Sequence, residues 1–365
     1  MAEITSITAS CLCGTSTYPF TLPTSSLPLP ARFCHCTTCR RTSGVLCTTY
    51  ITVPPDLNPA PEFSTLTPYD SSDRLTRYFC TTCGTHMFIR ERASGRLIVC
   101  TGVLDRTAGI VQLIGHEWIS DTRDGGASGW LRTIEGRAQD RWLGDEDRSE
   151  EAPLNWRSSL SEPKGTAASA TKDKLHAHCH CNGASFYISR PSARSLDVGS
   201  APFPDLMVPY HSGASAENPT GEAWWLRSNS AGDKTRFLAG TCTCRSCRLA
   251  SGFDFVAWAF VPTSNITLED GSPFKRYFGS IRTFESSPGT KRAFCGVCGA
   301  SMFWDGREGL LDVAVGLLDA DSGVRAEEWV EWWTGRVSFG EEGLNGSLVD
   351  ALGEGLRKWH ADTEA

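Results

Sequence analysis

Cysteine spacing constrains this chain of 365 residues more than any other feature. Of its 16 cysteines, all but Cys47 and Cys100 fall into three kinds of cluster, C-x-C, C-x-C-x-x-C and C-x-x-C-G, and this series occurs twice in the same order. The clustered cysteines are Cys11, Cys13, Cys34, Cys36, Cys39, Cys80 and Cys83 in the first half and Cys179, Cys181, Cys242, Cys244, Cys247, Cys295 and Cys298 in the second. Chance does not produce such an order twice, so the sequence indicates a duplication.

The residues around the clusters repeat as well. Each triplet is followed by a Ser-Gly pair and then by a β-rich run, over 45–53 and 253–261. The offset between the halves grows from 168 residues at the first cluster to 208 at the second, so the second copy carries about 40 extra residues. We predict a first domain over 1–145, a flexible linker over 146–173 and a second domain over 174–365. The extra residues form an insertion within 182–241 that we interpret as a long loop or lid.

Segment lengths indicate the fold class. The strand-like runs are short and end at Gly, Pro, Ser or Asp, which is typical of all-β domains. Apolar residues at helical spacing occur only near the end of the chain, where we expect a helix over 347–360. The simplest organisation is therefore two copies of one β domain.

Composition limits the partners and the compartment. The net charge of −7 and the absence of a basic run argue against nucleic-acid binding. No apolar run approaches the roughly 20 residues that span a bilayer, so no membrane contact is expected. The first residues show no basic stretch leading into an apolar one, which favours the cytoplasm. In a reducing compartment, clustered cysteines bind metals more often than they form disulfides.

The outer clusters supply the ligands of a closed metal site. One C-x-x-C turn offers two sulfurs, and tetrahedral zinc takes four ligands, so the C-x-C pair near the start of each half is the natural second pair. We predict one Cys₄ site in each half. The ligands are Cys11, Cys13, Cys80 and Cys83 in one, and Cys179, Cys181, Cys295 and Cys298 in the other. Disulfides and iron are the alternatives for these pairs.

The central triplets, Cys34, Cys36 and Cys39 and then Cys242, Cys244 and Cys247, lack a fourth cysteine. Three protein ligands and an open position are typical of catalytic zinc, and a thiol substrate is an attractive fourth ligand because sulfur is soft. We therefore predict the triplets as catalytic. The neighbouring arginines, which could hold a substrate carboxylate, are Arg40, Arg41, Arg245 and Arg248.

A purely structural zinc, with a histidine or water as fourth ligand, remains the alternative for each triplet. His35 is the nearest histidine, but strand alternation points it away from the cysteines on either side. The run His116-Glu117-Trp118 could reach a metal site, but the second copy has Glu at 327 where the first has His116. Because the tryptophan is repeated and the histidine is not, we expect the tryptophan to pack in the core. Cys47 and Cys100 are expected to be buried as small apolar side chains.

These motifs resemble the glutathione-dependent formaldehyde-activating enzyme family, also called the CENP-V/GFA domain. The resemblance rests on the three clusters of each half, on the arginine that follows each triplet and on Phe79 and Phe294 before the C-x-x-C-G turns. It covers both halves and leaves out the linker and the insertion. In the second copy, Asn182 precedes the glycine that usually follows C-x-C directly, and Thr243 replaces the histidine of the central motif.

The resemblance implies an Mss4-like β fold with two zinc ions per domain, four per chain. It also implies a carbon–sulfur lyase reaction on the adduct of a small thiol such as glutathione with a small carbonyl compound such as formaldehyde. The departures in the second copy make the first copy the better candidate for activity. A non-catalytic, zinc-stabilised protein-interaction module is the alternative, because fold membership does not settle a reaction.

Overall fold

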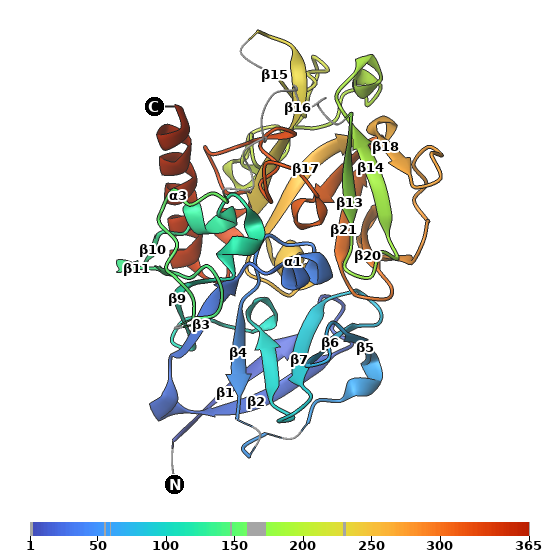
Figure 1. The fold of residues 1–365 in the computed structure, drawn as a ribbon. Coiled ribbons are helices and arrows are strands. Elements are labelled where there is room, and N and C mark those ends of the chain that lie inside the picture. Colours follow the sequence, from blue (N-terminus) through green and yellow to red (C-terminus); the bar gives the residue numbers. More distant parts are fainter. Residues whose placement is uncertain are drawn as a thin grey trace.

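The computed structural model describes residues 3–54, 56–58, 60–146, 148–158, 173–228 and 231–364. Strands dominate it, and the two predicted copies are visible as two packed β units (Figure 1). Most of the first copy, in blue and cyan, lies in the lower part of that view, and most of the second, from green to red, lies in the upper part. The all-β prediction with two related halves is confirmed.

The first copy begins with a hairpin, β1 (Ile4–Ser10) and β2 (Thr17–Pro23). A five-stranded antiparallel sheet follows in the order β4-β8-β7-β6-β5. Its strands are β4 (Tyr50–Val53), β5 (Leu66–Asp70), β6 (Leu75–Cys80), β7 (His86–Glu91) and β8 (Leu97–Cys100). The parallel pair β3 (Leu29–Cys34) and β9 (Val111–Glu117) continues into β12 (Asp140–Arg141), and β10 (Thr133–Ile134) pairs with β11 (Arg137–Ala138).

The second copy repeats this plan. Its hairpin is β13 (Lys174–His178) and β14 (Ser185–Ser189), joined by β18 (Ile266–Leu268). The larger sheet runs β15-β16-β17-β22-β21-β20-β19, with β23 parallel to β16. Its strands are β15 (Leu226–Ser228), β16 (Lys234–Cys242), β17 (Val256–Pro262), β19 (Ile281–Ser287), β20 (Thr290–Cys295), β21 (Ser301–Arg307), β22 (Leu310–Ala314) and β23 (Val330–Trp332).

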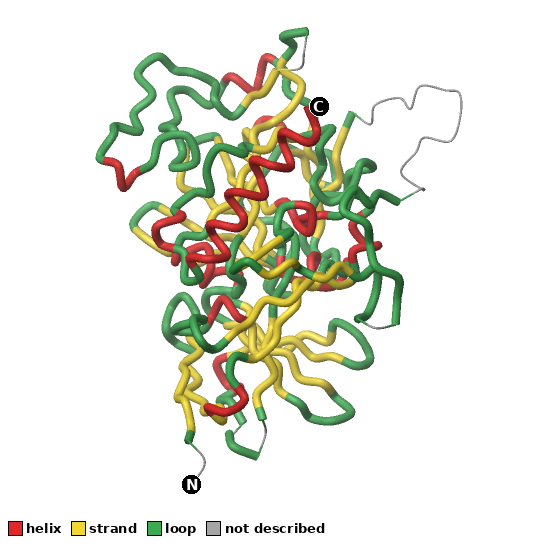
Figure 2. Tube along the Cα trace, turned by 90° about the vertical axis from the view of Figure 1, so that its left-hand side faces the viewer, coloured by secondary structure: helices red, strands yellow, loops and turns green. Residues whose placement is uncertain are grey.

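In the part of the chain that the structure describes, α-helices occur in three places, and only one of them was expected. The C-terminal helix α3 (Gly346–Glu364) is confirmed and lies beside β10 and β11, on the face turned toward the viewer in Figure 2. The short helices α1 (Thr37–Ser43) and α2 (Arg245–Ser251) were missed, because seven residues are too few to show a helical period. Each begins inside a cysteine triplet.

The two copies meet across the ends of α1 and α2 in a reciprocal pattern. Gly316 N–H donates to Gly44 O, and Gly102 N–H donates to Gly252 O, both at 3.0 Å. Gly44 and Gly252 have left-handed φ values of +81° and +86°. A Cβ on either one would lie 2.2 Å from a backbone oxygen of the opposite copy. The repeated Ser-Gly pairs of the sequence are therefore contact points between the copies.

The insertion packs against the second copy. Trp224 and Trp225 are fully buried, and their indole N–H groups donate to Ala201 O and Ser195 O. The predicted range 182–241 also contains β14 and most of β16, which match β2 and β3 of the first copy. The extra residues therefore lie between β14 and β16.

The predicted linker falls partly outside the described residues, at 147 and 159–172. Its first part runs along the first copy: Leu143 N–H donates to Glu150 O, and Ala152 N–H donates to Arg141 O. Within the described residues, no helix combines the length and the apolar character needed to cross a membrane.

Candidate metal centres

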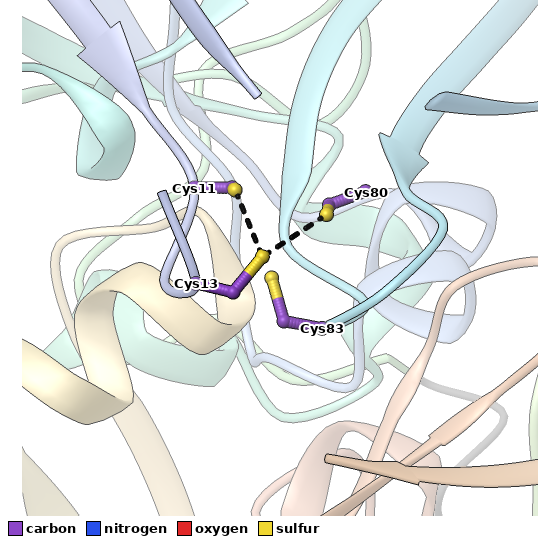
Figure 3. Close-up of side chains that lie close together, drawn as sticks. All are labelled: Cys11, Cys13, Cys80 and Cys83. Atoms are coloured by element: carbon purple, nitrogen blue, oxygen red, sulfur yellow. Dashed lines mark hydrogen bonds between the residues drawn. The ribbon is translucent and has the colours of Figure 1, made fainter. Parts of the chain in front are cut away.

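The outer cysteine pairs come together as the sequence predicts. In the first copy, Cys11 and Cys13 follow β1, while Cys80 and Cys83 form the turn between β6 and β7, and the four side chains converge (Figure 3). The Sγ atoms of Cys11 and Cys13 are 3.4 Å apart, and those of Cys13 and Cys80 are 3.6 Å apart. In the second copy the Sγ atom of Cys181 lies 3.6 Å from that of Cys179 and 3.5 Å from that of Cys295.

These separations fit a shared tetrahedral metal. A zinc–sulfur bond of about 2.3 Å places tetrahedral sulfurs about 3.8 Å apart, whereas a disulfide needs about 2.05 Å. All 16 cysteines are unpaired, and within each outer cluster the four sulfurs lie within 4.8 Å of one another. The disulfide alternative is therefore wrong for this structure, and the donor sets suit a metal ion.

Both triplets adopt one local geometry that arises from the strand-to-helix step. Cys34 ends β3, Cys36 caps the start of α1, and Cys39 lies in the first turn of that helix. The Cys36 sulfur accepts the Cys39 N–H at 3.3 Å, and in the second copy the Cys244 sulfur accepts the Cys247 N–H at 3.2 Å. The three sulfurs of each triplet lie within 4.8 Å of one another, so each triplet can hold a metal.

A buried arginine faces each triplet. Arg77 on β6 donates to the Cys39 sulfur at 3.1 Å, and Arg292 on β20 donates to the Cys247 sulfur at 3.5 Å. Hydrogen bonds from Cys34 and Cys36, together with Arg77, hold the pKa of Cys39 well below its usual value. Hydrogen bonds from Cys242 and Cys244, together with Arg292, do the same for Cys247. Each triplet therefore stabilises a thiolate.

Sequence reasoning missed these two arginines. Each stands three residues before its C-x-x-C turn, at 77 and 292, so the repeat itself carried the signal. A search limited to residues adjacent to the triplets could not find them, because β6 and β20 reach the triplets only through the sheet.

The second triplet opens into a cavity of about 290 Å³. All three cysteines line it, together with Arg292, and its walls also carry an aromatic group of side chains: Tyr210, Trp258, Phe260, Trp304 and Phe339. The insertion supplies part of the wall through Pro204, Asp205, Leu206 and Tyr210. The buried Asp205 carboxylate accepts the backbone N–H of Tyr210 at 2.7 Å and that of Phe339 at 2.5 Å. This carboxylate therefore connects the insertion to Phe339, which also lines the cavity.

A carboxyl group lies near each triplet, but in a different position. Glu117 at the end of β9 accepts a hydrogen bond from the Cys34 thiol, and burial raises its pKa to about 7. In the second cavity Asp312 on β22 pairs with Arg307 at 2.8 Å, and burial raises the pKa of this carboxyl to about 6. Ser338 takes the place of Glu117, because Thr243 N–H bonds to Ser338 O as His35 N–H bonds to Glu117 O.

Three of the four arginines expected to bind substrate are buried between the copies. Arg40 donates to Gly316 O at 3.0 Å, Arg41 donates to Leu317 O at 2.9 Å, and Arg248 donates to Gly102 O. Arg245 is exposed, and neither it nor Arg248 lines the cavity. The structure thus brings the cysteines of each triplet together but not these arginines with them.

The remaining candidate residues lie in the core or at the surface. His35 is buried and bonds through Nε2 to Nδ1 of His116 at 3.0 Å, so it faces away from the triplet as strand alternation predicted. Cys47 and Cys100 are buried as expected. The core assignment of the tryptophan in 116–118 is wrong: Trp118 is 36% exposed. Phe339, rather than Trp329, is its counterpart, because both residues are left-handed caps of a 3-10 turn.

Comparison with known families agrees with this geometry. The model of the family described as glutathione-dependent formaldehyde-activating enzyme matches residues 6–121 and 230–336. The chain belongs to this family. A comparison with curated proteins gives no match.

The second family match begins after the insertion and so omits Cys179 and Cys181. The structure nevertheless places both beside Cys295 and Cys298. The second domain is therefore complete in its metal ligands, although the insertion separates them in sequence.

Proposed function

We propose that the chain is a zinc-dependent carbon–sulfur lyase that makes or cleaves the adduct of a thiol with a small carbonyl compound. Family membership supports the reaction class, glutathione and formaldehyde being the reactants that the family description suggests. The observation that carries the proposal for this chain is the cavity at the second triplet, since all three cysteines line it. A structural metal site has no need of a cavity at its ligands.

The donor sets suit zinc at four positions, two in each copy. Four thiols form each outer site and three form each triplet site, which leaves an open position at each triplet. When bound there, zinc would supply positive charge that stabilises a thiolate and a coordination position for a substrate sulfur.

The other parts of the reaction fall to the chain's own residues. Arg292 and Arg77 hold one cysteine of each triplet as thiolate, and the aromatic walls of the cavity at the second triplet reduce the contact of bound reactants with water. In the forward direction the substrate thiolate forms a bond to the carbonyl carbon, the π electrons move to oxygen, and that oxygen takes a proton. The reverse step breaks the carbon–sulfur bond and returns the proton. Asp312 with Arg307 in the second copy, and Glu117 in the first, are the polar groups placed to exchange it.

The aromatic walls favour an apolar carbonyl partner at the second triplet. A volume of about 290 Å³ is at the lower limit of ordinary ligand pockets, so the occupant is compact. We propose aromatic or branched aldehydes for the second copy and the smaller formaldehyde for the first.

Metal content and turnover of one variant pair test the proposal. Cys244→Ser is expected to lower bound zinc from about four to about three per chain and to abolish turnover at the second triplet. Cys47→Ala, which changes a buried cysteine outside every cluster, is the control and is expected to keep both. Turnover is followed by NMR of the thiol–aldehyde adduct.

Unchanged metal content in Cys244→Ser would contradict a metal at the triplet. Normal metal content without turnover on any thiol–aldehyde pair, together with stable capture of a protein partner, would favour the interaction module instead.

A further inference from the structure

Two histidines of the second copy share one face of a strand outside the metal centres described above. His176 and His178 lie two residues apart on β13, and side chains at that spacing point to the same side. Their rings stack with centroids 4.6 Å apart and an interplanar angle of 23°. Tyr187 on β14, the residue paired with His176 across the hairpin, also stacks on His176, with centroids 4.8 Å apart. The two imidazoles are therefore held in place by the sheet.

Asp319 completes the cluster from a distant part of the chain. Its backbone N–H donates to His176 O at 2.9 Å, which places its carboxylate beside the two rings. One ligand atom from each of the three side chains lies within 4.8 Å of the others. Arg41 of the first copy holds the Asp319 Oδ1 atom at 3.1 Å, which leaves Oδ2 to serve as a ligand.

The hydrogen bonds of both rings leave one nitrogen of each free to bind a metal. His178 donates from Nδ1 to Cys179 O at 3.1 Å, which leaves the lone pair on Nε2. His176 bonds through Nε2 to Ser185 Oγ at 2.8 Å, which leaves Nδ1. Fixing a ring through its second nitrogen is the usual support of a histidine that binds a metal.

We infer that His176, His178 and Asp319 form a further binding site for a divalent transition metal, distinct in donor chemistry from the cysteine sites. Two imidazoles and one carboxylate suit Zn²⁺, Co²⁺, Ni²⁺ or Fe²⁺. The all-thiolate sites instead favour metal ions that prefer sulfur ligands. Three protein ligands leave coordination positions open. The carboxylate is half exposed, and a cavity of about 430 Å³ with His176 and Asp319 in its wall lies next to it. The wall also carries Asp321 and Glu328 along with the cations Lys174 and Arg190, so with Asp319 its three carboxylates outnumber its two cations.

The first copy provides a natural comparison. The offset of 168 residues aligns Thr8 and Ser10 with the two histidines, and Asp105 occupies the place of Asp319. There Asp105 accepts the Thr8 N–H at 3.2 Å, as part of an equivalent backbone contact. The backbone around Asp105 and Asp319 is thus the same in both copies, and the two copies differ in the imidazoles, which the second copy alone has at these positions. The inferred site belongs to the second copy alone.

Cobalt uptake tests the inference, using the full-length protein loaded with no more than the four zinc ions per chain that fill the cysteine sites. Equilibrium dialysis with Co²⁺ is expected to show one ion per chain bound in addition to the zinc. Its absorption spectrum should contain weak ligand-field bands and lack the strong thiolate-to-cobalt bands that replacement of zinc at the cysteine sites would produce. His176→Ala should abolish this uptake, and Asp319→Asn should weaken it at least tenfold.

Matched variants in the first copy, Thr8→Ala and Asp105→Asn, should leave the extra cobalt unchanged. Zinc content and circular dichroism of every variant report whether the cysteine sites and the fold persist. No uptake beyond the zinc sites, or uptake that His176→Ala leaves intact, would overturn the inference. Loss of uptake in Thr8→Ala would overturn it as well, because the effect would then not be specific to the histidines.

Discussion

Tyr50 and Thr52 on β4 occupy the positions that Trp258 and Phe260 occupy on β17. The strand registers establish the match, since Tyr50 pairs with Cys100 and Trp258 with Ala314 in equivalent sheets. Across the sheet, Ile98 in the first copy corresponds to Asp312 in the second. The cysteine triplets themselves, with their helix caps and facing arginines, are the same in both copies.

The comparison teaches that the two copies share their cysteine clusters and differ in the residues that surround them. The second triplet has aromatic walls, an Arg307–Asp312 pair and part of an insertion in its cavity. The first has Glu117 beside Cys34 and the phenol of Tyr50 near Cys39. At the second triplet the structure defines a cavity lined by all three cysteines.

The largest expected effect comes from the four-cysteine cluster that each copy contains. Cys83→Ser and Cys298→Ser each remove one ligand of a closed site. Zinc contributes roughly 10–16 kcal/mol to the folding of small modules, which is comparable to the whole stability of a domain. Both variants should therefore lose the folded state of the affected copy, as measured by thermal unfolding and zinc content. A variant that keeps its melting temperature would show that its site is not structural.

Glycine-to-alanine substitutions at the contact between the copies should destabilise the protein equally from either side. Gly44→Ala and Gly252→Ala combine a left-handed backbone with a Cβ 2.2 Å from an oxygen of the other copy, so each should lower the free energy of unfolding by about 2–4 kcal/mol. Gly14→Ala is the control, because its φ is +76° with nothing within 4 Å, and it should cost only about 1 kcal/mol. Chemical denaturation measures all three. Equal losses in all three variants would rule out close packing as the cause.

Exchanging the wall residues tests the proposed difference in substrate. Trp258→Tyr combined with Phe260→Thr gives the second copy the residues of the first. The loss of apolar contact should lower kcat/KM for an aromatic aldehyde with a thiol by roughly tenfold or more, and affect formaldehyde much less. Competition kinetics with both aldehydes provide the measurement. Equal losses for both would indicate general damage to the site instead of altered selectivity.

The smallest expected effect is the pH dependence that Asp312 adds to the stability of the second copy. Burial raises the pKa of Asp312 from its ordinary 3.8 to about 6, so the folded state holds this proton more tightly than the unfolded state does. Its contribution to stability is full at low pH and is lost as the pH rises through about 6. Asp312→Asn should therefore flatten the decrease in unfolding free energy between about pH 4 and pH 6. Ile98→Val, at the matched position of the first copy, should leave that slope unchanged.

The sequence determined the duplication, the β class and the membership of all four cysteine clusters. These are encoded locally, because a C-x-x-C turn or a C-x-C-x-x-C step places its sulfurs through a few backbone angles. Repetition then identified which pairs belong together, even across the insertion that separates Cys181 from Cys242.

Only the tertiary structure decided which other residues lie beside the cysteine clusters. Arg40, Arg41 and Arg248 follow the triplets in sequence, yet they are buried against carbonyl groups of the opposite copy. Arg77 and Arg292 reach the triplets from neighbouring strands, and Asp319 reaches His176 from more than a hundred residues away. The physical reason is that strand pairing and the contact between copies join segments far apart in the chain, and residue spacing within one segment does not record those contacts.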